Sequence, residues 1–307
     1  MNALVGYTGF VGSNLKDSAV FDGLYNSKNI SSAFGTNPDL LVYAGIPAAK
    51  YLANSAPEKD LEVIFQAQEN IKKISPKRLV LISTIDVFKT PEDVNEDSAI
   101  VAENLQAYGK NRRILEIWTR ENFPNALIVR LPGLFGKNIK KNFIYDFIKK
   151  IPFRLTEKLF NEFSQKEPAL KNFYDLQDNG FYQCKNLNAD DEKTLKEILE
   201  RLNFSALNFT DSRSTYQFYP LSRLWSDIEV ALKNNLQLVH LATAPVQVGE
   251  LYQYLTGKNF SNELAGQPAR YDFKTKFADL FGGENDYLLD KNAVMKSIKD
   301  FVESYEA

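Results

Sequence analysis

The chain has 307 residues, of which 44% are hydrophobic and 25% are charged, which suits a large α/β domain with a second, smaller lobe. Its net charge of -2 argues against nucleic-acid or anionic-membrane partners, because both need a basic surplus. Cys184 and His240 are the only cysteine and histidine, so we expect no intrachain disulfide, no metal site and no Ser-His-Asp triad. We also expect no secretion signal, no membrane span and a reducing, cytoplasmic location.

The first dozen residues hold a glycine-rich turn between an apolar run, residues 2–5, and a helix start. The pattern is Gly6-x-x-Gly9-x-x-Gly12. A strand, a glycine turn and a helix N-terminus can cradle a pyrophosphate, because backbone N–H groups and the positive end of the helix dipole face the phosphates. The spacing differs from the usual G-x-G-x-x-G, so a loop that merely needs glycine to turn is the alternative. The predicted cofactor contacts here are Gly6, Thr8, Gly9, Phe10, Val11 and Gly12.

Short apolar strands alternate with amphipathic helices over the first 131 residues. This alternation predicts a Rossmann-like, doubly wound parallel sheet of the α/β class, covered on both faces. Only 29 positions (41 minus 12) separate Gly12 from Leu41, so the second crossover is shortened and one helix is reduced or missing. The expected strands are 21–26, 40–45, 78–83 and 126–131, and the expected helices are 11–17, 57–74 and 103–121.

The middle of the chain changes character. It is rich in Phe, Tyr, Asn and Lys and poor in clean strands, although residues 190–202 predict one helix. The alternation returns with a helix at 221–232 and a strand at 237–242, in which His240 is a packed strand residue. The tail from 248 to 307 is expected to be mostly helical with loops. We therefore assign a dinucleotide-binding domain and a smaller mixed substrate lobe. Their predicted boundaries are 1–137 with 221–243, and 138–220 with 244–307.

Five segments, taken together, resemble the extended short-chain dehydrogenase/reductase family. They are the glycine turn, the strand end 83–88 (Ser-Thr-Ile-Asp-Val-Phe), the helix segment 108–112, the strand and loop 129–136, and the segment that begins at Arg213. Many members of that family act on nucleotide sugars. Segments 83–88 and 108–112 look most similar to the family's dTDP-4-dehydrorhamnose reductases, and the shortened crossover is also similar to GDP-fucose synthases.

The resemblance implies a catalytic role for Thr84, Tyr108 and Arg112. Tyr108 would exchange a proton with the sugar oxygen, and Thr84 would hydrogen-bond the same oxygen. A phenol does this work if its pKa falls from about 10 towards neutral, and Arg112, one helical turn away, would lower it. The family has lysine at this position, and arginine is bulkier, planar and always protonated. The site therefore either catalyses with Arg112 in place of the lysine, or has lost catalysis and only binds the cofactor. The alternative is that Tyr108 and Arg112 form a pair on the helix surface without a catalytic role.

The choice of cofactor depends on the end of the second strand. Asn26, Ser27 and Lys28 stand there in place of the acid that NAD enzymes usually have, which favours NADP over NAD. Ala44 and Gly45, at the end of the third strand, are small enough to let a dinucleotide cross the sheet, or they simply allow tight packing. Tyr108 and Arg112 are also expected to contact the cofactor.

The predicted partner is a small molecule, a nucleotide sugar by the family resemblance. Asp86, Asn142 and Arg213 are the predicted substrate contacts. Reduction of a 4-keto sugar and epimerisation both remain open, and a non-catalytic NAD(P)-binding sensor or interaction module is the alternative function. Helices 57–74 and 103–121 resemble the pair through which the family forms dimers, so a homodimer is expected.

Overall fold

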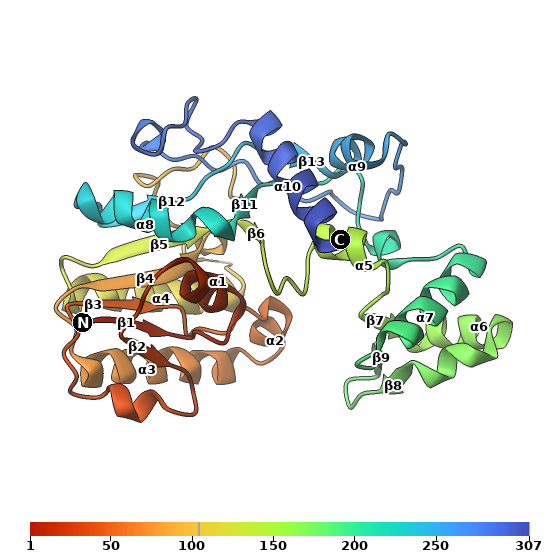
Figure 1. Ribbon diagram of the computed structural model, residues 1–307, viewed down its shortest axis with the longest axis horizontal. Coiled ribbons are helices and arrows are strands. Elements are labelled where there is room, and N and C mark those ends of the chain that lie inside the picture. Colours follow the sequence, from red (N-terminus) through yellow and green to blue (C-terminus); the bar gives the residue numbers. More distant parts are fainter. Residues whose placement is uncertain (104, 307) are drawn as a thin grey trace. The chain divides into compact units, whose positions relative to one another are not determined.

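The computed structural model describes residues 1–103 and 105–306, without the side chain of Glu306. The chain divides into two compact units (Figure 1). The first unit comprises Met1–Ile139, Thr215–Val246 and Ala269–Lys299. The second unit comprises Lys140–Ser214, Gln247–Pro268 and the segment from Asp300 onward.

In the part of the chain that the structure describes, six parallel strands form the central sheet of the first unit. Their order is β12-β5-β4-β3-β1-β2, and every neighbouring pair is parallel. The predicted doubly wound parallel sheet is therefore confirmed. The strands are β1 (Asn2–Val5), β2 (Gly23–Tyr25), β3 (Leu40–Tyr43), β4 (Leu79–Thr84), β5 (Leu127–Leu131) and β12 (Leu238–His240).

Helices cover both faces of this sheet. The covering helices are α1 (Phe10–Ser18), α3 (Pro57–Ile74), α4 (Ala107–Asn122) and α8 (Leu224–Lys233). Successive strand residues point to opposite faces. Leu4 and Val42 belong to the cluster that α1 and α8 bury, whereas Val5 and Leu41 belong to the cluster under α3 and α4. Both faces are thus apolar, as the continuous apolar strands of the sequence predicted.

The second crossover is short, as expected. Between β2 and β3 the chain forms only the 3₁₀ helix η1 (Ile30–Ala33). The strand that would lie beyond β2 in the usual order is missing, so β2 is an edge strand among the described residues. β3 lies directly beside β1, on the side away from β2.

The first unit has further short elements around the sheet. The short strands β11 and β6 pair in parallel, with Phe218 opposite Gly133. α10 and β13 extend across the boundary between the two units along the chain. These elements are α2 (Lys50–Ser55), η2 (Ile85–Val87), β6 (Gly133–Phe135), β10 (Thr215–Tyr216), β11 (Phe218–Pro220), η5 (Leu221–Arg223), β13 (Val246–Gln247), η6 (Ala278–Phe281) and α10 (Lys291–Glu306).

The second unit contains strands that the sequence did not reveal. Its sheet is antiparallel, in the order β7-β9-β8, and its helices bury an aromatic core in which the rings of Phe160 and Tyr182 stack at 3.6 Å. Helix α7 matches the predicted helix 190–202 closely. The elements are α5 (Phe143–Lys149), β7 (Arg154–Thr156), α6 (Glu157–Lys166), η3 (Pro168–Asn172), β8 (Tyr174–Leu176), β9 (Phe181–Cys184), α7 (Ala189–Arg201), η4 (Ala206–Phe209) and α9 (Val248–Thr256).

The tail does not divide as expected. Residues 269–299 pack with the first unit, although they were assigned to the substrate lobe. The cause is a set of contacts between the backbone of this segment and β12 or the residues that follow β12. The His240 ring nitrogen Nδ1 contacts the Lys274 carbonyl (3.0 Å), and the Leu288 N–H donates to the Ala242 carbonyl (2.8 Å). The tail is also less helical than expected, because a long stretch of loops joins α9 to α10.

A buried ionic network joins α4 to the sheet. The Glu116 carboxylate receives two hydrogen bonds from Arg130 (2.6 and 2.9 Å), one from the Ser83 hydroxyl (2.7 Å) and one from Arg113 (3.0 Å). Arg130 also contacts Nε2 of His240 (3.1 Å). His240 is fully buried in β12, so its prediction as a packed strand residue is confirmed. Burial and the Arg130 charge lower the pKa of His240 to about 3, so it stays neutral.

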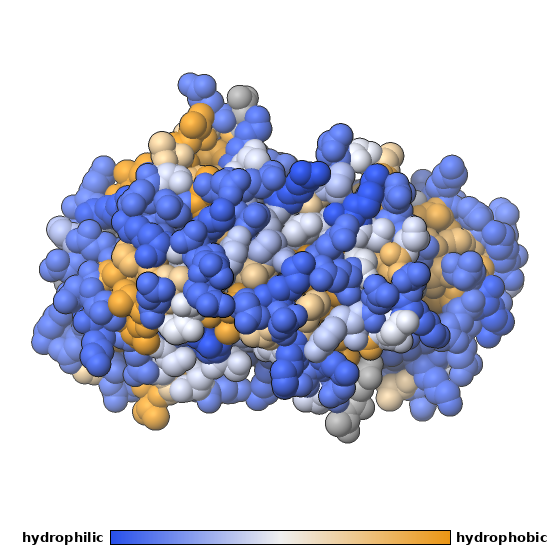
Figure 2. Space-filling model, turned by 90° about the horizontal axis from the view of Figure 1, so that it is seen from above, coloured by the Kyte–Doolittle hydropathy of each residue, from blue (hydrophilic) through white to orange (hydrophobic). Residues whose placement is uncertain are grey.

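The face shown in Figure 2 is mostly hydrophilic, with hydrophobic residues in separate patches. Among the described residues, no helix combines the length and the apolar character that a membrane crossing requires. Those residues also hold no group of three acidic, histidine or cysteine side chains arranged to bind a metal ion.

Candidate active site

The glycine turn has the close approaches that its sequence predicts. Gly6 has φ of +91°, and an added Cβ there would lie 2.4 Å from the Ala44 carbonyl oxygen. A Cβ on Gly12 would lie 2.1 Å from the Gly6 carbonyl oxygen, so α1 packs onto the turn only because Gly12 lacks a side chain. Gly9 is the N-cap of α1 and provides no side-chain cap, which leaves the first turn of α1 dependent on other partners for its N–H groups.

The glycine turn lies where the order of the strands in the sheet reverses. The chain passes from β1 to β2 on one side and then returns to β3 on the other, so the crevice between β1 and β3 is the switch point of the sheet. Ala44 and Gly45 follow β3 here, and a Cβ on Gly45 would lie 2.9 Å from Val5. Thr8 is exposed, and Phe10 and Val11 are half-buried in the first turn of α1. These predicted cofactor residues are thus brought together.

Residues 26–28 form a turn directly after β2. The N–H of Lys28 donates to Oδ1 of Asn26 (2.9 Å), and both Ser27 and Lys28 are exposed. The Gly6 N–H donates to the carbonyl of Tyr25 (2.7 Å), which places this turn beside the glycine turn. Residues 26–28 include no acidic residue, and Asp22 precedes the strand rather than following it.

Thr84 and Tyr108 are brought together by β4 and α4. Thr84 ends β4, and its hydroxyl accepts a hydrogen bond from the N–H of Asp86 (3.2 Å). Tyr108 lies in the first turn of α4, and its hydroxyl lies close enough to the Thr84 side chain to interact with it. Gly109 permits this approach, since a Cβ there would lie 1.9 Å from the Asp86 carbonyl oxygen. The pair lies at the carboxyl end of β4, the edge at which open α/β sheets bind ligands.

Arg112 is held in a buried ion pair. Its Nη1 donates to Oδ2 of Asp60 (2.5 Å) and its Nη2 donates to the Pro47 carbonyl (2.7 Å). The side chains of Arg112 and Asp60 are only 5% and 9% exposed. The guanidinium lies over the ring of Tyr108, 4.0 Å from its centroid. Arg112 therefore joins α4 to α3 and to the loop after β3.

The pKa of Tyr108 shifts upward, opposite to the predicted direction. Burial is the largest cause and raises the pKa of the hydroxyl. Arg112 lowers this pKa, as the sequence predicted, and so does the nearby Thr84 side chain. The carboxylates of Asp86 and Asp60 raise it. Burial thus outweighs the charge of Arg112, and Asp60 offsets part of that charge.

Two residues of this site escaped sequence reasoning. Lys50, the first residue of α2, donates to Oδ1 of Asp86 (3.0 Å), and the Tyr271 hydroxyl donates to the same oxygen (2.9 Å). Lys50 also approaches the Tyr271 hydroxyl (3.5 Å). The ring of Tyr216 lies against Tyr271, with centroids 5.7 Å apart. Lys50 follows the end of β3, which was a usable signal, whereas Tyr271 is 185 residues from Asp86 and had none.

Two predicted substrate contacts, Asn142 and Arg213, lie in the second unit. Asn142 is the N-cap of α5, where its side chain accepts from the N–H of Ile144 (3.0 Å). Arg213 donates to both carboxylate oxygens of Asp211 (3.0 and 2.6 Å) and to Glu263 (3.0 Å). The hydrogen bonds from Arg213 hold the pKa of Asp211 well below its usual range. Both side chains thus have local structural roles, and their substrate roles stay predictions.

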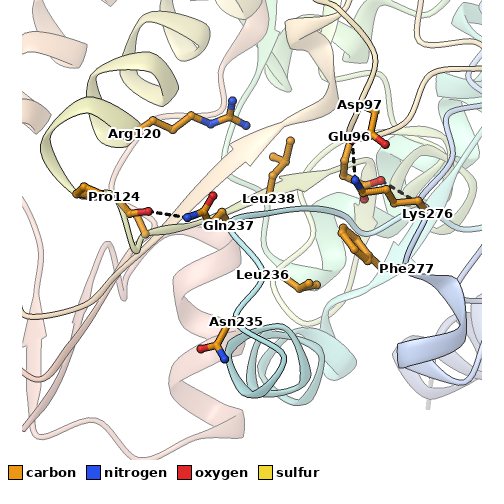
Figure 3. A pocket seen from close by; sticks show the side chains of 11 residues that line it. Glu96, Asp97, Arg120, Pro124, Asn235, Leu236, Gln237, Leu238, Lys276 and Phe277 are labelled. Atoms are coloured by element: carbon orange, nitrogen blue, oxygen red, sulfur yellow. Dashed lines mark hydrogen bonds and ion pairs between the residues drawn. The ribbon is translucent and has the colours of Figure 1, made fainter.

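A polar pocket of about 590 Å³ lies at the other end of the sheet (Figure 3). It lies beside the start of β12, at the amino ends of the parallel strands, so it is separate from the glycine turn. Two of its charged residues are linked to a third, since Lys276 pairs with Asp97 (2.6 Å) and the Lys276 N–H donates to Glu96 (3.0 Å). Gln237 donates to the Pro124 carbonyl (2.9 Å). The lining residues are Glu96, Asp97, Arg120, Pro124, Ala126, Asn235, Leu236, Gln237, Leu238, Lys276 and Phe277.

Comparisons by sequence give no relatives: no family model matches this chain, and no curated protein matches it. Solved structures do match over almost the whole chain. One is the UDP-N-acetylglucosamine 4-epimerase from Methanobrevibacter ruminantium in complex with UDP-N-acetylmuramic acid. The TM-score is 0.65 at 10% identity, and the match covers 99% of this chain and 97% of that chain.

Two further matches are similar in extent. The dTDP-4-dehydrorhamnose reductase from Bacillus anthracis in complex with NADP has a TM-score of 0.63 at 14% identity, covering 99% of this chain and 97% of that one. The Bordetella bronchiseptica enzyme WbmG in complex with NAD and UDP has a TM-score of 0.63 at 12% identity, covering 99% and 94%. These proteins are extended short-chain dehydrogenases/reductases, so the predicted resemblance is confirmed at the level of the fold.

Proposed function

We propose that this protein is an NAD(P)-dependent oxidoreductase that acts on a nucleotide-activated sugar, either by 4-keto reduction or by epimerisation. The observation that carries the proposal is that Thr84 and Tyr108 lie together at the carboxyl end of β4. The glycine turn stands on the same edge of the same sheet, two strands away. The structural neighbours include a reductase with NADP and an enzyme with NAD and UDP, which supports this class of reaction.

The glycine turn fits a dinucleotide. The backbone approaches at Gly6 and Gly12 leave no room for a Cβ, and the first turn of α1 has no side-chain cap, so the turn suits a pyrophosphate. Residues 26–28 would contact the adenosine ribose, and the absence of an acid there favours NADP over NAD. Ala44 and Gly45 would let the dinucleotide cross the sheet. When bound, the nicotinamide would supply or accept the hydride.

Tyr108 would carry the proton chemistry. Its hydroxyl would give a proton to the sugar oxygen in reduction and take it back in oxidation. Thr84, which lies beside this hydroxyl, would bind the same sugar oxygen and fix its position. We propose that Asp86, Asn142 and Arg213 contact the substrate. A reducing, cytoplasmic location fits a chain whose single cysteine cannot form an intrachain disulfide.

A Gly12→Ala variant tests the cofactor site. The added methyl group would meet the Gly6 carbonyl, so α1 must shift away from the turn. We expect NADPH affinity to fall by about tenfold or more, an energy of about 1.4 kcal/mol. Fluorescence titration of the purified protein with NADPH measures this. Gly35→Ala is the control, because Gly35 has φ of +71° and open space around it, so the variant is strained without touching the turn. Unchanged NADPH affinity in Gly12→Ala would contradict the proposed site.

We also propose that the protein forms a homodimer through α3 and α4. Both helices expose large apolar side chains, Phe65 (50% exposed) on α3 and Ile117 (43% exposed) on α4. A glutamate at either position would place a charge in the interface, so Phe65→Glu and Ile117→Glu are expected to be monomers at micromolar concentration. Light scattering measures the mass. Leu176→Glu is the control, since Leu176 is also apolar, is even more exposed (60%) and lies in the second unit. A monomeric wild-type protein would refute the proposal.

A further inference from the structure

Two ion pairs stand beside Tyr108, and they differ in burial. Arg112 and Asp60 form a pair that is almost fully enclosed, with further hydrogen bonds from Arg112 to two backbone carbonyls. Lys50 and Asp86 form a pair whose side chains are 42% and 20% exposed. A buried pair of this kind is rigid, because breaking it leaves an uncompensated charge. A partly exposed pair contributes little to stability and can rearrange.

A continuous set of contacts leads from Lys50 to Tyr108. Lys50 binds the Asp86 carboxylate, and the Asp86 N–H donates to the Thr84 hydroxyl, which lies beside Tyr108. A second contact arises one turn further along α2. Asn54 accepts a hydrogen bond from the backbone N–H of Tyr108 (3.0 Å). Since residues four apart share a helix face, α2 presents Lys50 and Asn54 together towards this site.

We propose that Lys50 is a positioning residue for Tyr108 that compensates the charge of Asp86, and that Arg112 mainly holds α4 against α3. This inference rests on the proposed function. It assigns to Lys50 part of the role that the resembled family gives to the lysine at the position of Arg112. The charge that acts on the Tyr108 hydroxyl then depends on whether Lys50 stays paired with Asp86. Tyr271, which shares the same Asp86 oxygen, keeps that carboxylate in place.

The groups that face Tyr108 come from four elements. Arg112 lies on α4, Asp60 on α3, Asp86 after β4, and Tyr271 on the loop that follows residue 268. A phenol becomes an anion when it loses its proton, so a nearby negative charge raises its pKa and a nearby positive charge lowers it. Asp86 raises the pKa of Tyr108. Removing Lys50 therefore leaves Asp86 uncompensated and raises that pKa further, whereas neutralising Asp86 lowers it.

Titration of Tyr108 by fluorine NMR tests this inference without cofactor or substrate. Monofluorotyrosine is incorporated into the full chain, which brings phenol titration into a milder pH range. The Tyr108 signal is assigned by its loss in Tyr108→Phe. We expect the pKa to rise by about one unit in Lys50→Met and to fall by about one unit in Asp86→Asn, the effect of one neighbouring charge. Lys50→Arg keeps the charge and should leave the pKa within about 0.3 units of the wild-type value.

Lys59→Met is the matched control, because it removes the same charge from an exposed site in the first turn of α3. It should leave the Tyr108 signal unchanged. Opposite shifts in the Lys50 and Asp86 variants would support the inference, since a general loosening of the fold moves both in one direction. Absent or parallel shifts would overturn it. Failure of the proposed function is seen separately, as a lack of NADPH binding or turnover in the wild-type protein.

Discussion

Replacing Tyr108 with phenylalanine is expected to lower NADPH oxidation with a nucleotide-linked 4-keto sugar by about 10³-fold, within the range that a positioned proton donor contributes. The variant keeps the ring under Arg112 and removes only the hydroxyl that lies beside Thr84. Because the interaction is used in the transition state, kcat and kcat/KM should fall together. The affinity for NADPH should change by less than about threefold, since the glycine turn is untouched. Steady-state kinetics and fluorescence titration measure the two quantities.

Tyr43→Phe is the control for this experiment. Tyr43 is another buried tyrosine, in the core under α3, so the variant also removes a buried phenol hydroxyl. It should retain turnover. If Tyr108→Phe also retained turnover, Tyr108 would not be the proton donor. If the wild-type protein bound NADPH and turned over no sugar nucleotide, the alternative of a binding module with a decayed site would replace the enzyme.

Elements with strong local signals were predicted closely. Helix α3 has the predicted bounds 57–74, because Pro57 suits a first helical position, acids follow in the first turn, and Ser75 takes a left-handed conformation after the end. The apolar strands β4 and β5 were predicted to within one residue at each end. The antiparallel sheet of the second unit was missed. Its strands have three or four residues, too few to show a period of two.

The site shows the same division between local and distant information. The spacing of Tyr108 and Arg112 placed both on one helix face, and the glycine spacing placed the turn. The partner of Arg112 could not be predicted, because Asp60 lies 52 residues earlier and meets it only when α3 packs on α4. That contact determines how strongly the positive charge of Arg112 lowers the pKa of Tyr108. Sequence reasoning thus located the groups of the site but misjudged the net direction of the Tyr108 pKa shift.

The network around Glu116 fixes α4 on the sheet that carries Thr84. Glu116 lies eight residues after Tyr108, on the same helix face, and is fully buried with Arg130. Ser83 binds Glu116 and directly precedes Thr84. The register between α4 and β4, and with it the contact between Tyr108 and Thr84, therefore depends on this carboxylate.

A Glu116→Gln variant is expected to lose about 3–5 kcal/mol of unfolding free energy, because Arg130 remains buried without a counter-charge. Replacing the pair together, as Glu116→Leu with Arg130→Met, should be less damaging than Glu116→Gln, since no fully buried charge is left unpaired and only the partly exposed Arg113 loses its partner. Urea unfolding of both variants at neutral pH measures the difference. A smaller loss in Glu116→Gln than in the double variant would show that the pair's charges are not matched in the folded state.

The pH dependence of this loss gives an independent check. Burial alone would raise the pKa of Glu116, but the hydrogen bonds and charge of Arg130 outweigh it and leave the pKa lowered. A carboxyl group with a lowered folded pKa stabilises the fold above its unfolded pKa of about 4.3 and loses that contribution as the pH falls through the folded value. The advantage of the wild-type protein over Glu116→Gln should therefore be constant above about pH 5 and shrink in more acidic solution. An advantage that grew on acidification would mean that Glu116 is protonated in the native protein, and the ionic link between α4 and β5 would then have to be a neutral hydrogen bond.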